Sequence, residues 1–240
     1  MRIFLKNHEG FVLFAHEEPG NTYKKTLELA VKEQVDLSYV DLRMAQLSKV
    51  TLERAKMQYA NLSGADLSYS RIEECDFTGA KMEKTKLRIS EVLESTFSSA
   101  FMRGAQFCHS EISSSNFFAS SLQMASFSDS RLNSLFFLRS DLSGAELAEA
   151  QIRSSVFRQT DMAQTRIRET AFFDTNFDRA ILPEHANQGA KVRNCRFSEC
   201  RSESKKLDGD FVESTGFFSA VREMLEDAAN RPDRLVARER

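Results

Sequence analysis

The sequence predicts an all-β solenoid, in which the chain winds as a four-sided β-helix of about eight coils. Three patterns indicate it: a large apolar residue at every fifth position, a small residue two places before it, and similar residues twenty positions apart. The large residues run without exception from Leu37 to Leu182. The small positions carry Ala, Ser, Thr or Cys, and the four exceptions are Val35, Val40, Val50 and Leu135.

The five-residue period excludes a long helix and a simple strand, whose side chains repeat every 3.6 and 2 residues. Two residues that are two places apart point to the same side of an extended segment, so each small–large pair faces the interior. A turn must then redirect the chain before the next pair. The chain therefore coils around an interior that is filled by one small and one large side chain per side.

Four repeats per coil follow from the columns of residues that lie twenty positions apart. One column, the Phe column, ends in seven phenylalanines from Phe77 to Phe197. A second column, from Leu52 to Val192, is rich in Ile and Val, and a third contains only Leu and Met. Coils that stack like neighbouring strands, about 4.8 Å apart, would form a rod roughly 40 Å long.

The repeat resembles that of the pentapeptide-repeat family, whose consensus is Ala-(Asp/Asn)-Leu-x-x. Ala60-Asn61-Leu62 and Ala65-Asp66-Leu67 match it, and Ser140-Asp141-Leu142 matches it with serine at the small position. The resemblance covers about two-thirds of the chain and implies a right-handed, quadrilateral β-helix. Similar members are encoded by phages and bacteria, and some form dimers through a C-terminal element.

We expect residues 1–34 to cap the first coil with two short strands and a helix. Asn21 is the expected N-cap of this helix, because Asn side chains accept hydrogen bonds from the first turn. Tyr23, Leu27, Ala30 and Val31 would face the coil.

The β-helix itself is expected at 35–200, with an irregular loop at 183–190. Val192 and Phe197 resume the five-residue frame after this loop, so the loop is one side of a coil and not the end of the solenoid. Residues 201–240 should form a C-terminal helix and a charged tail. Four apolar residues of this helix are candidates for capping the last coil or for a homodimer: Phe217, Phe218, Val221 and Leu225.

Composition excludes several classes of function. The net charge of −2 disfavours a protein that binds nucleic acid directly. The sequence has no apolar run long enough to cross a membrane and no secretory signal, and its four cysteines lack a CxxC motif, which favours a cytoplasmic protein or one delivered into a host cell.

No catalytic, metal or cofactor site is expected. The four histidines are scattered, and no phosphate-binding glycine loop or HExxH motif occurs. Cys195 and Cys200 fall on small interior positions and are interpreted as packing residues. Cys108 and His109 face outward without further candidate ligands.

Two groups of outward residues are candidate binding surfaces. On the side of the Phe column, apolar residues replace polar ones at Phe118, Phe136, Leu138 and Val156. Such clusters mark interaction sites, although a local distortion could tuck some of them inward. On the side of the Ile/Val column, acidic residues collect at Glu53, Glu73, Glu74, Glu91, Glu94 and Glu111. Farther along this side the charge is basic, at Arg131, Arg153, Lys191 and Arg193.

The sequence predicts a non-enzymatic protein that binds and modulates a protein target as an inhibitor, a protector or an adaptor. Homodimers through the C-terminal helix or the apolar cluster are expected as alternatives. The family resemblance implies two further alternatives: a DNA mimic that modulates a type II topoisomerase such as gyrase, or a secreted effector or phage-encoded inhibitor of a host defence protein. Between residues 36 and 182, 17 Lys and Arg nearly match 19 Asp and Glu, which disfavours mimicry along the whole rod.

Overall fold

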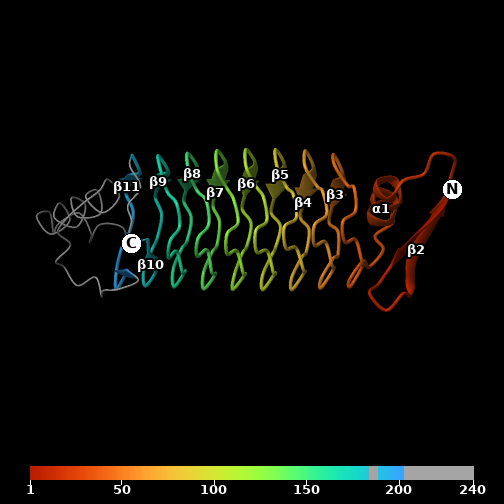
Figure 1. Cartoon of the computed structure of the whole chain (residues 1–240), viewed down its shortest axis with the longest axis horizontal. Helices are drawn as coiled ribbons and strands as arrows, with labels where there is room; N and C mark the ends of the chain where they lie inside the picture. The colour runs from red at the N-terminus through yellow and green to blue at the C-terminus, as the bar shows by residue number, and fades with distance from the viewer. Residues whose placement is uncertain (184–188, 203–240) are drawn as a thin grey trace, which may run out of the picture.

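The computed structural model describes residues 1–183 and 189–202, which form a rod of stacked coils (Figure 1). Eight short strands make one parallel sheet along the rod, in the order β11-β9-β8-β7-β6-β5-β4-β3. Their bounds are β3 (Thr51–Glu53), β4 (Arg71–Glu73), β5 (Glu91–Leu93), β6 (Glu111–Ser113), β7 (Arg131–Asn133), β8 (Gln151–Arg153), β9 (Ala171–Phe173) and β11 (Lys191–Arg193). Successive strands start twenty residues apart, so this sheet spans about seven turns and the predicted β-helix is confirmed.

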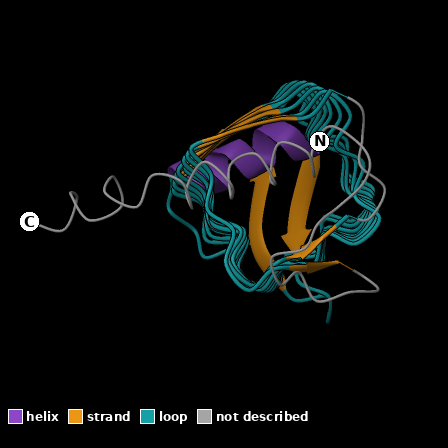
Figure 2. Cartoon of the chain, turned by 90° about the vertical axis from the view of Figure 1, so that its left-hand side faces the viewer, coloured by secondary structure: helices purple, strands orange, loops and turns teal. Residues whose placement is uncertain are grey.

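One side of each coil is a strand, and the other three sides are turns. The side that contains the eight-stranded sheet is called the strand side below; Figure 2 shows its strands gathered along one side of the end view, with loops around the rest. The turns are joined to neighbouring coils by single parallel bridges such as Asp76↔Thr96 and Lys81↔Phe101. Each coil thus bonds to the coils on both sides of it, which pairs the backbone groups of the rod.

The chain turns at the residue that lies two places after each large interior residue. From Tyr39 to Arg179 every residue of this series has a positive φ, for example 58° at Tyr59 and 55° at Ile89. Glycine occupies only four of these positions, Gly64, Gly79, Gly104 and Gly144. The left-handed conformation costs roughly 1–2 kcal/mol for other residues. Packing of the interior must therefore compensate for this backbone strain at most corners.

The acidic or amide residue of the repeat has a local structural role. The Oδ1 atom of Asp66 accepts a hydrogen bond from the Ser68 backbone N–H at 3.0 Å, and Asn61 accepts one from Ser63 at 3.2 Å. Asp and Asn favour turns because their short side chains bond to the backbone two residues ahead. The Asp or Asn of the consensus therefore fixes the turn that follows each large residue.

The Phe column forms a ladder of stacked rings inside the rod. The angle between neighbouring ring planes is 5° for Phe77 and Phe97 and reaches 25° for Phe137 and Phe157, whose centroids are 4.7 Å apart. The tilt is largest beside Leu135, which is fully buried at a position that elsewhere holds a smaller residue.

The N-terminal cap consists of the antiparallel strands β1 (Arg2–Lys6) and β2 (Val12–Glu17) and the helix α1 (Tyr23–Lys32). The N-cap of α1 is Thr22, whose side chain accepts from the Lys25 N–H, so the assignment of Asn21 was wrong by one residue. Asn21 is instead buried, where its amide donates to the His16 carbonyl and its Oδ1 accepts from the Thr26 hydroxyl. Both Asn21 and Thr22 have side chains that can cap a helix, and the extended backbone of Thr22 makes it the N-cap.

The cap closes one end of the rod (Figure 1). Leu5 and Leu27 are fully buried against the core cluster, whereas Tyr23 lines a hollow with Asp41 and Gln46 of the first coil and is 49% exposed. The Lys6 carbonyl accepts a hydrogen bond from the Asp41 N–H at 2.7 Å. A Glu28 oxygen accepts from the Thr51 N–H at 3.0 Å. These bonds satisfy backbone groups at the open edge of the first coil.

At the other end, the five-residue frame resumes after the loop, as predicted. Val192 pairs with Phe172 in the parallel register of the sheet, and the Phe197 ring stacks on Phe177 at 4.9 Å. Strands β10 (Ile181–Leu182) and β12 (Arg201–Ser202) also pair. Most of the predicted loop, residues 184–188, lies outside the described residues, as do residues 203–240. The described part of the chain contains no helix with the length and apolar composition needed to span a bilayer.

Candidate functional site

The interior of the rod is occupied by its own side chains. The large residues from Leu37 to Leu182 are at most 2% exposed, and the buried serines between them bond to the backbone of adjacent coils. For example, the Ser110 hydroxyl donates to the Leu87 carbonyl at 2.7 Å and accepts from the Ser90 N–H at 3.1 Å. Binding by this part of the chain must therefore use outward side chains.

The structure brings the four predicted apolar residues onto adjacent coils of one side, and they are called the apolar patch below. Phe136 is 52% exposed, while Phe118, Leu138 and Val156 are half-buried. Phe136 is bridged to Val156 on the next coil, and the Phe136 carbonyl accepts from the Phe117 N–H at 2.8 Å. The side chain directed inward is that of the neighbouring Leu135. The ring of Phe136 is therefore exposed while its backbone is hydrogen-bonded to the neighbouring coil.

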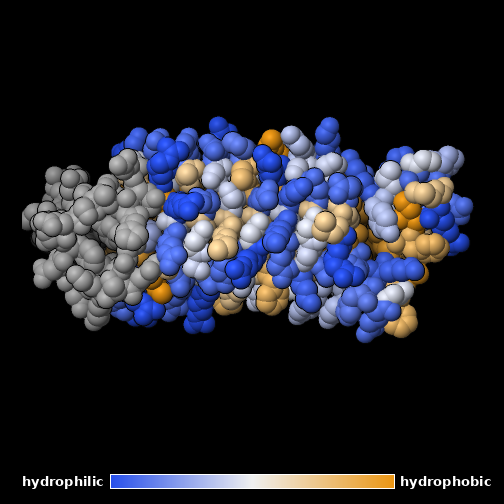
Figure 3. All heavy atoms as spheres, viewed as in Figure 1, coloured by the Kyte–Doolittle hydropathy of each residue, from blue (hydrophilic) through white to orange (hydrophobic). Residues whose placement is uncertain are grey.

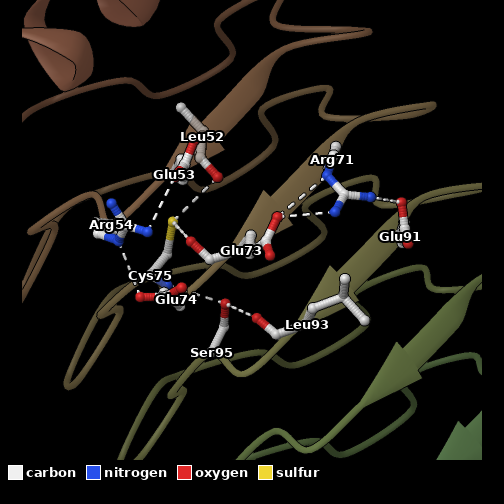
Figure 4. A network of polar contacts seen from close by, with 10 residues as sticks. All are labelled: Leu52, Glu53, Arg54, Arg71, Glu73, Glu74, Cys75, Glu91, Leu93 and Ser95. Carbon is white, nitrogen blue, oxygen red and sulfur yellow. Dashed lines mark hydrogen bonds and ion pairs between the residues drawn. The ribbon is translucent and has the colours of Figure 1, made fainter.

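The predicted glutamates lie on the first half of the strand side, from β3 to the residue after β6, called the acidic half below. Figure 4 shows that two arginines tie several of them together. Arg54 contacts Glu74 at 3.0 Å and Glu53 at 3.3 Å, and Arg71 contacts both Glu73 and Glu91. Glu94 and Glu111 are exposed and have no ion pair among the described residues. Six glutamates against two arginines leave this half with a charge of −4.

The second half of the strand side is basic and is called the basic half below. It carries Arg131, Arg153, Lys191 and Arg193, all exposed, against the single acid Asp174, a charge of +3. The Arg153 guanidinium lies 4.5 Å from the centre of the Phe173 ring, and none of the four bases has an ion pair within the described residues. The sequence predicted both halves, but their placement on one continuous sheet depends on the coil.

The cysteines are structural. Cys75, Cys195 and Cys200 are buried, and each thiol lies within hydrogen-bonding distance of backbone carbonyls. Burial raises the pKa of Cys75 and of Cys200 to about 11, so neither is a thiolate nucleophile at neutral pH. Half-buried Cys108 lies 3.0 Å from the Ser126 hydroxyl. Within the described residues no group of three or more His, Cys, Asp or Glu could hold a metal ion.

An aromatic stack at the first coils was not predicted. The rings of Tyr39 and Tyr59 stack at 5.1 Å, and the His8 ring lies 6.0 Å from Tyr39. Tyr59 extends toward the next coil and lies over Gly79, where an added Cβ would be 2.6 Å from the ring. The signal in the sequence is that Tyr39, Tyr59 and Gly79 are spaced twenty residues apart, so they stack in one column at a corner.

The remaining candidates, Phe217, Phe218, Val221 and Leu225, lie outside the described residues.

Comparison with known proteins supports the fold class. The family "Pentapeptide repeats" matches eight copies, at residues 45–83 and 120–159. The resemblance to pentapeptide repeats is thus confirmed for these two stretches, which lie within the observed coil. No match is found among curated proteins.

Three solved pentapeptide-repeat structures are similar at low identity. Rfr23 from the cyanobacterium Cyanothece 51142 is 15% identical, with a TM-score of 0.37, over 38% of this chain and 63% of that one. HetL from Nostoc sp. strain PCC 7120, involved in heterocyst differentiation regulation, is 16% identical. The match covers 78% of this chain and 95% of HetL, with a TM-score of 0.35. QnrB1, a plasmid-mediated fluoroquinolone resistance protein, is 20% identical. The match covers 64% of this chain and 80% of QnrB1, with a TM-score of 0.33. Likenesses of this size do not assign a function.

Proposed function

We propose that the chain is a non-catalytic binding protein that presents the apolar patch to a protein target. The observation that carries the proposal is Phe136, a large ring that is 52% exposed although the coil fixes its backbone on both sides. Figure 3 shows that the visible face of the described rod is mostly hydrophilic, with separate hydrophobic groups. Inhibitor, protector and adaptor roles would all use such a surface.

The energetics favour a protein partner. Full burial of a phenylalanine side chain contributes about 1.5–3 kcal/mol relative to full exposure, and Phe136 has roughly half of this still to gain. The half-buried Phe118, Leu138 and Val156 surround it, so a partner would exclude water from a contiguous apolar area. Because the coil is already ordered, binding would cost little conformational entropy.

The test compares two matched phenylalanines. Phe136→Asp changes the apolar patch, and Phe101→Asp changes a phenylalanine that is 49% exposed at the equivalent ladder position of the neighbouring side. Both variants should keep the circular dichroism spectrum and melting temperature of the parent. Affinity purification from the native host should recover a partner with the parent and Phe101→Asp, and much less of it with Phe136→Asp. Equal recovery with all three proteins would contradict the proposal.

The DNA-mimic alternative is less well supported by the charge pattern. A DNA duplex carries about one negative charge per 1.7 Å, so roughly 20 charges would lie along the ~34 Å between the first and last strands of the sheet. The strand side has six glutamates in one half and four bases in the other. A gyrase supercoiling assay tests this role, and inhibition or protection at micromolar protein would restore it.

The origin of the target divides the proposal further. A host defence protein would fit a phage-encoded inhibitor, and a host transport or membrane protein would fit a secreted effector. The identity of the protein that the parent recovers, and that Phe136→Asp loses, distinguishes these two origins.

A further inference from the structure

The strand side is a long, flat strip whose two halves carry opposite charge. Its eight strands lie about 4.8 Å apart, so the strip is roughly 34 Å long, and three residues per strand make it about 10 Å wide. The acidic half covers β3 to β6, and the basic half covers β7 to β11. The boundary falls between β6 and β7, at the centre of the sheet, where Glu111 pairs in register with Arg131.

A two-fold axis that lies parallel to the strands, between β6 and β7, would bring each half opposite its complement in a second copy. Strand β6 would then oppose β7 of the other copy, so that Glu111 faces Arg131. Strand β5 would oppose β8, which places Glu91 and Glu94 against Arg153. Symmetric dimers need a surface that is complementary to itself under such an axis.

One of the two outer pairs follows the same rule: strand β3, with Glu53, would oppose β11, with Lys191 and Arg193. Strand β4 would oppose β9, and these two strands do not complement each other, because Glu74, just after β4, would lie opposite Asp174, just after β9. Three of the four opposing pairs of strands are therefore complementary.

The charges that would meet at the centre are free to do so. Glu94, Glu111, Arg131 and Arg153 are exposed, and none has an ion pair among the described residues. By contrast Arg54 and Arg71 already bind glutamates of their own coil or the next. Charged side chains without a close ion pair in the described part of the chain thus lie beside the axis, where a second copy would bring a partner to each.

We propose that the strand side is a self-recognition surface, on which two copies of this chain dock antiparallel by pairing the acidic half of one with the basic half of the other. The flat footprint is about 340 Å² per copy, below the roughly 800 Å² of a standard stable interface, so the dimer is weak and forms at high protein concentration. Charge pairing at an exposed surface makes it sensitive to salt, because the Debye length falls from about 30 Å at 0.01 M to about 8 Å at 0.15 M. This surface is distinct from the apolar patch, so the two proposals are tested separately.

The experiment uses two charge-reversed variants of the full chain and sedimentation equilibrium at about 100 μM protein, in low and in physiological salt. Glu94→Lys/Glu111→Lys brings the acidic half from a charge of −4 to zero and places bases on both sides of the axis, and Arg131→Glu/Arg153→Glu brings the basic half from +3 to −1 and places acids there. Each variant alone should be monomeric, because like charges would meet across the axis. An equimolar mixture should regain the dimer, since each new charge then meets its opposite in both halves.

The matched control is Arg88→Glu/Arg103→Glu, which replaces two exposed arginines on other sides of the rod. It changes the net charge by the same amount as Arg131→Glu/Arg153→Glu. It should dimerise like the parent in low salt, and melting curves establish that all variants are folded. A parent that is monomeric in low salt overturns the proposal. So does a dimer that persists in the single variants or in 0.5 M salt, which would assign it to apolar or C-terminal contacts, and so does a mixture that stays monomeric.

Discussion

Leu135 and Phe136 are neighbours in the chain and lie in opposite environments. Leu135 is fully buried at a position that usually holds a small residue, and Phe136 is 52% exposed at a position that usually holds a polar one. The inward position accepts a larger residue without opening the core, whereas the outward one has no packing requirement that would select phenylalanine. The difference teaches that inward residues maintain the rod, and that outward residues are free to serve the binding role proposed for Phe136.

The largest effect is expected inside the Phe ladder. The Phe117 ring stacks on Phe97 at 4.9 Å and on Phe137 at 5.0 Å. Phe117→Ala should lower the free energy of unfolding by about 3–5 kcal/mol, because it removes buried area and leaves a cavity. Phe117→Leu should lower the free energy of unfolding clearly less, because leucine already occupies this column in the first coil, at Leu37. Urea denaturation measures both, and equal losses would show that the ladder of rings is not what stabilises the coil.

A smaller loss is expected where a corner side chain meets the next coil. Gly79→Ala places a methyl group 2.6 Å from the Tyr59 ring, at a φ of +67°. Gly104→Ala has the same φ but meets only Lys84 Cγ at 3.6 Å. Both variants incur the cost of about 1–2 kcal/mol for a left-handed alanine, and only the first must also move Tyr59 from its stack. Thermal melts should therefore rank Gly79→Ala as less stable than Gly104→Ala; the reverse order would contradict the stacking of these rings.

A gain is expected at Ile89, a β-branched residue with a φ of +55° that is 45% exposed. Asparagine adopts this conformation more easily, so Ile89→Asn should raise the free energy of unfolding by about 0.5–1 kcal/mol. Ile89→Val keeps the branched Cβ and should give no such gain. Chemical denaturation of the pair tests whether corner strain is present in solution.

The smallest effect concerns pH. Hydrogen bonds from the Ser38 hydroxyl and backbone N–H lower the pKa of Asp36. Because the folded pKa lies below the unfolded value of about 3.9, this stabilisation is present above that value and is lost as pH falls through the folded pKa. Asp36→Asn keeps the acceptor and cannot titrate. Its urea midpoint should fall less than that of the parent between about pH 5 and pH 3, and an equal fall would contradict this contribution.

The interior could be predicted from the sequence because every coil repeats the same requirement. The five-residue period is unbroken from Leu37 to Leu182. This spacing predicted the sides of the coil, the stacking of residues twenty apart and the return to register at Val192. The start of α1 was missed by one residue, since Asn21 and Thr22 are both capable caps and only the backbone distinguishes them. The contact between the His8 and Tyr39 rings was missed because it joins the cap to a corner, and no periodic pattern relates these two parts.

For the surface, the sequence predicted which outward residues share a side of the coil, but not how exposed each of them is. That Phe136 is the most exposed residue of the apolar patch, and that the acidic and basic halves meet at the centre of one sheet, required the coil. Which partner binds there depends on the shape and chemistry of the partner's own surface.

The most direct test of the inward–outward distinction compares Leu135→Ala with Phe136→Ala by urea denaturation. Leu135→Ala should lower the free energy of unfolding by about 2 kcal/mol or more, because it empties a buried site. Phe136→Ala should change it by no more than about 0.5 kcal/mol, as is usual for surface substitutions. A loss for Phe136→Ala equal to or larger than that for Leu135→Ala would contradict the account, because Phe136 would then belong to the packing of the rod and not to its binding surface.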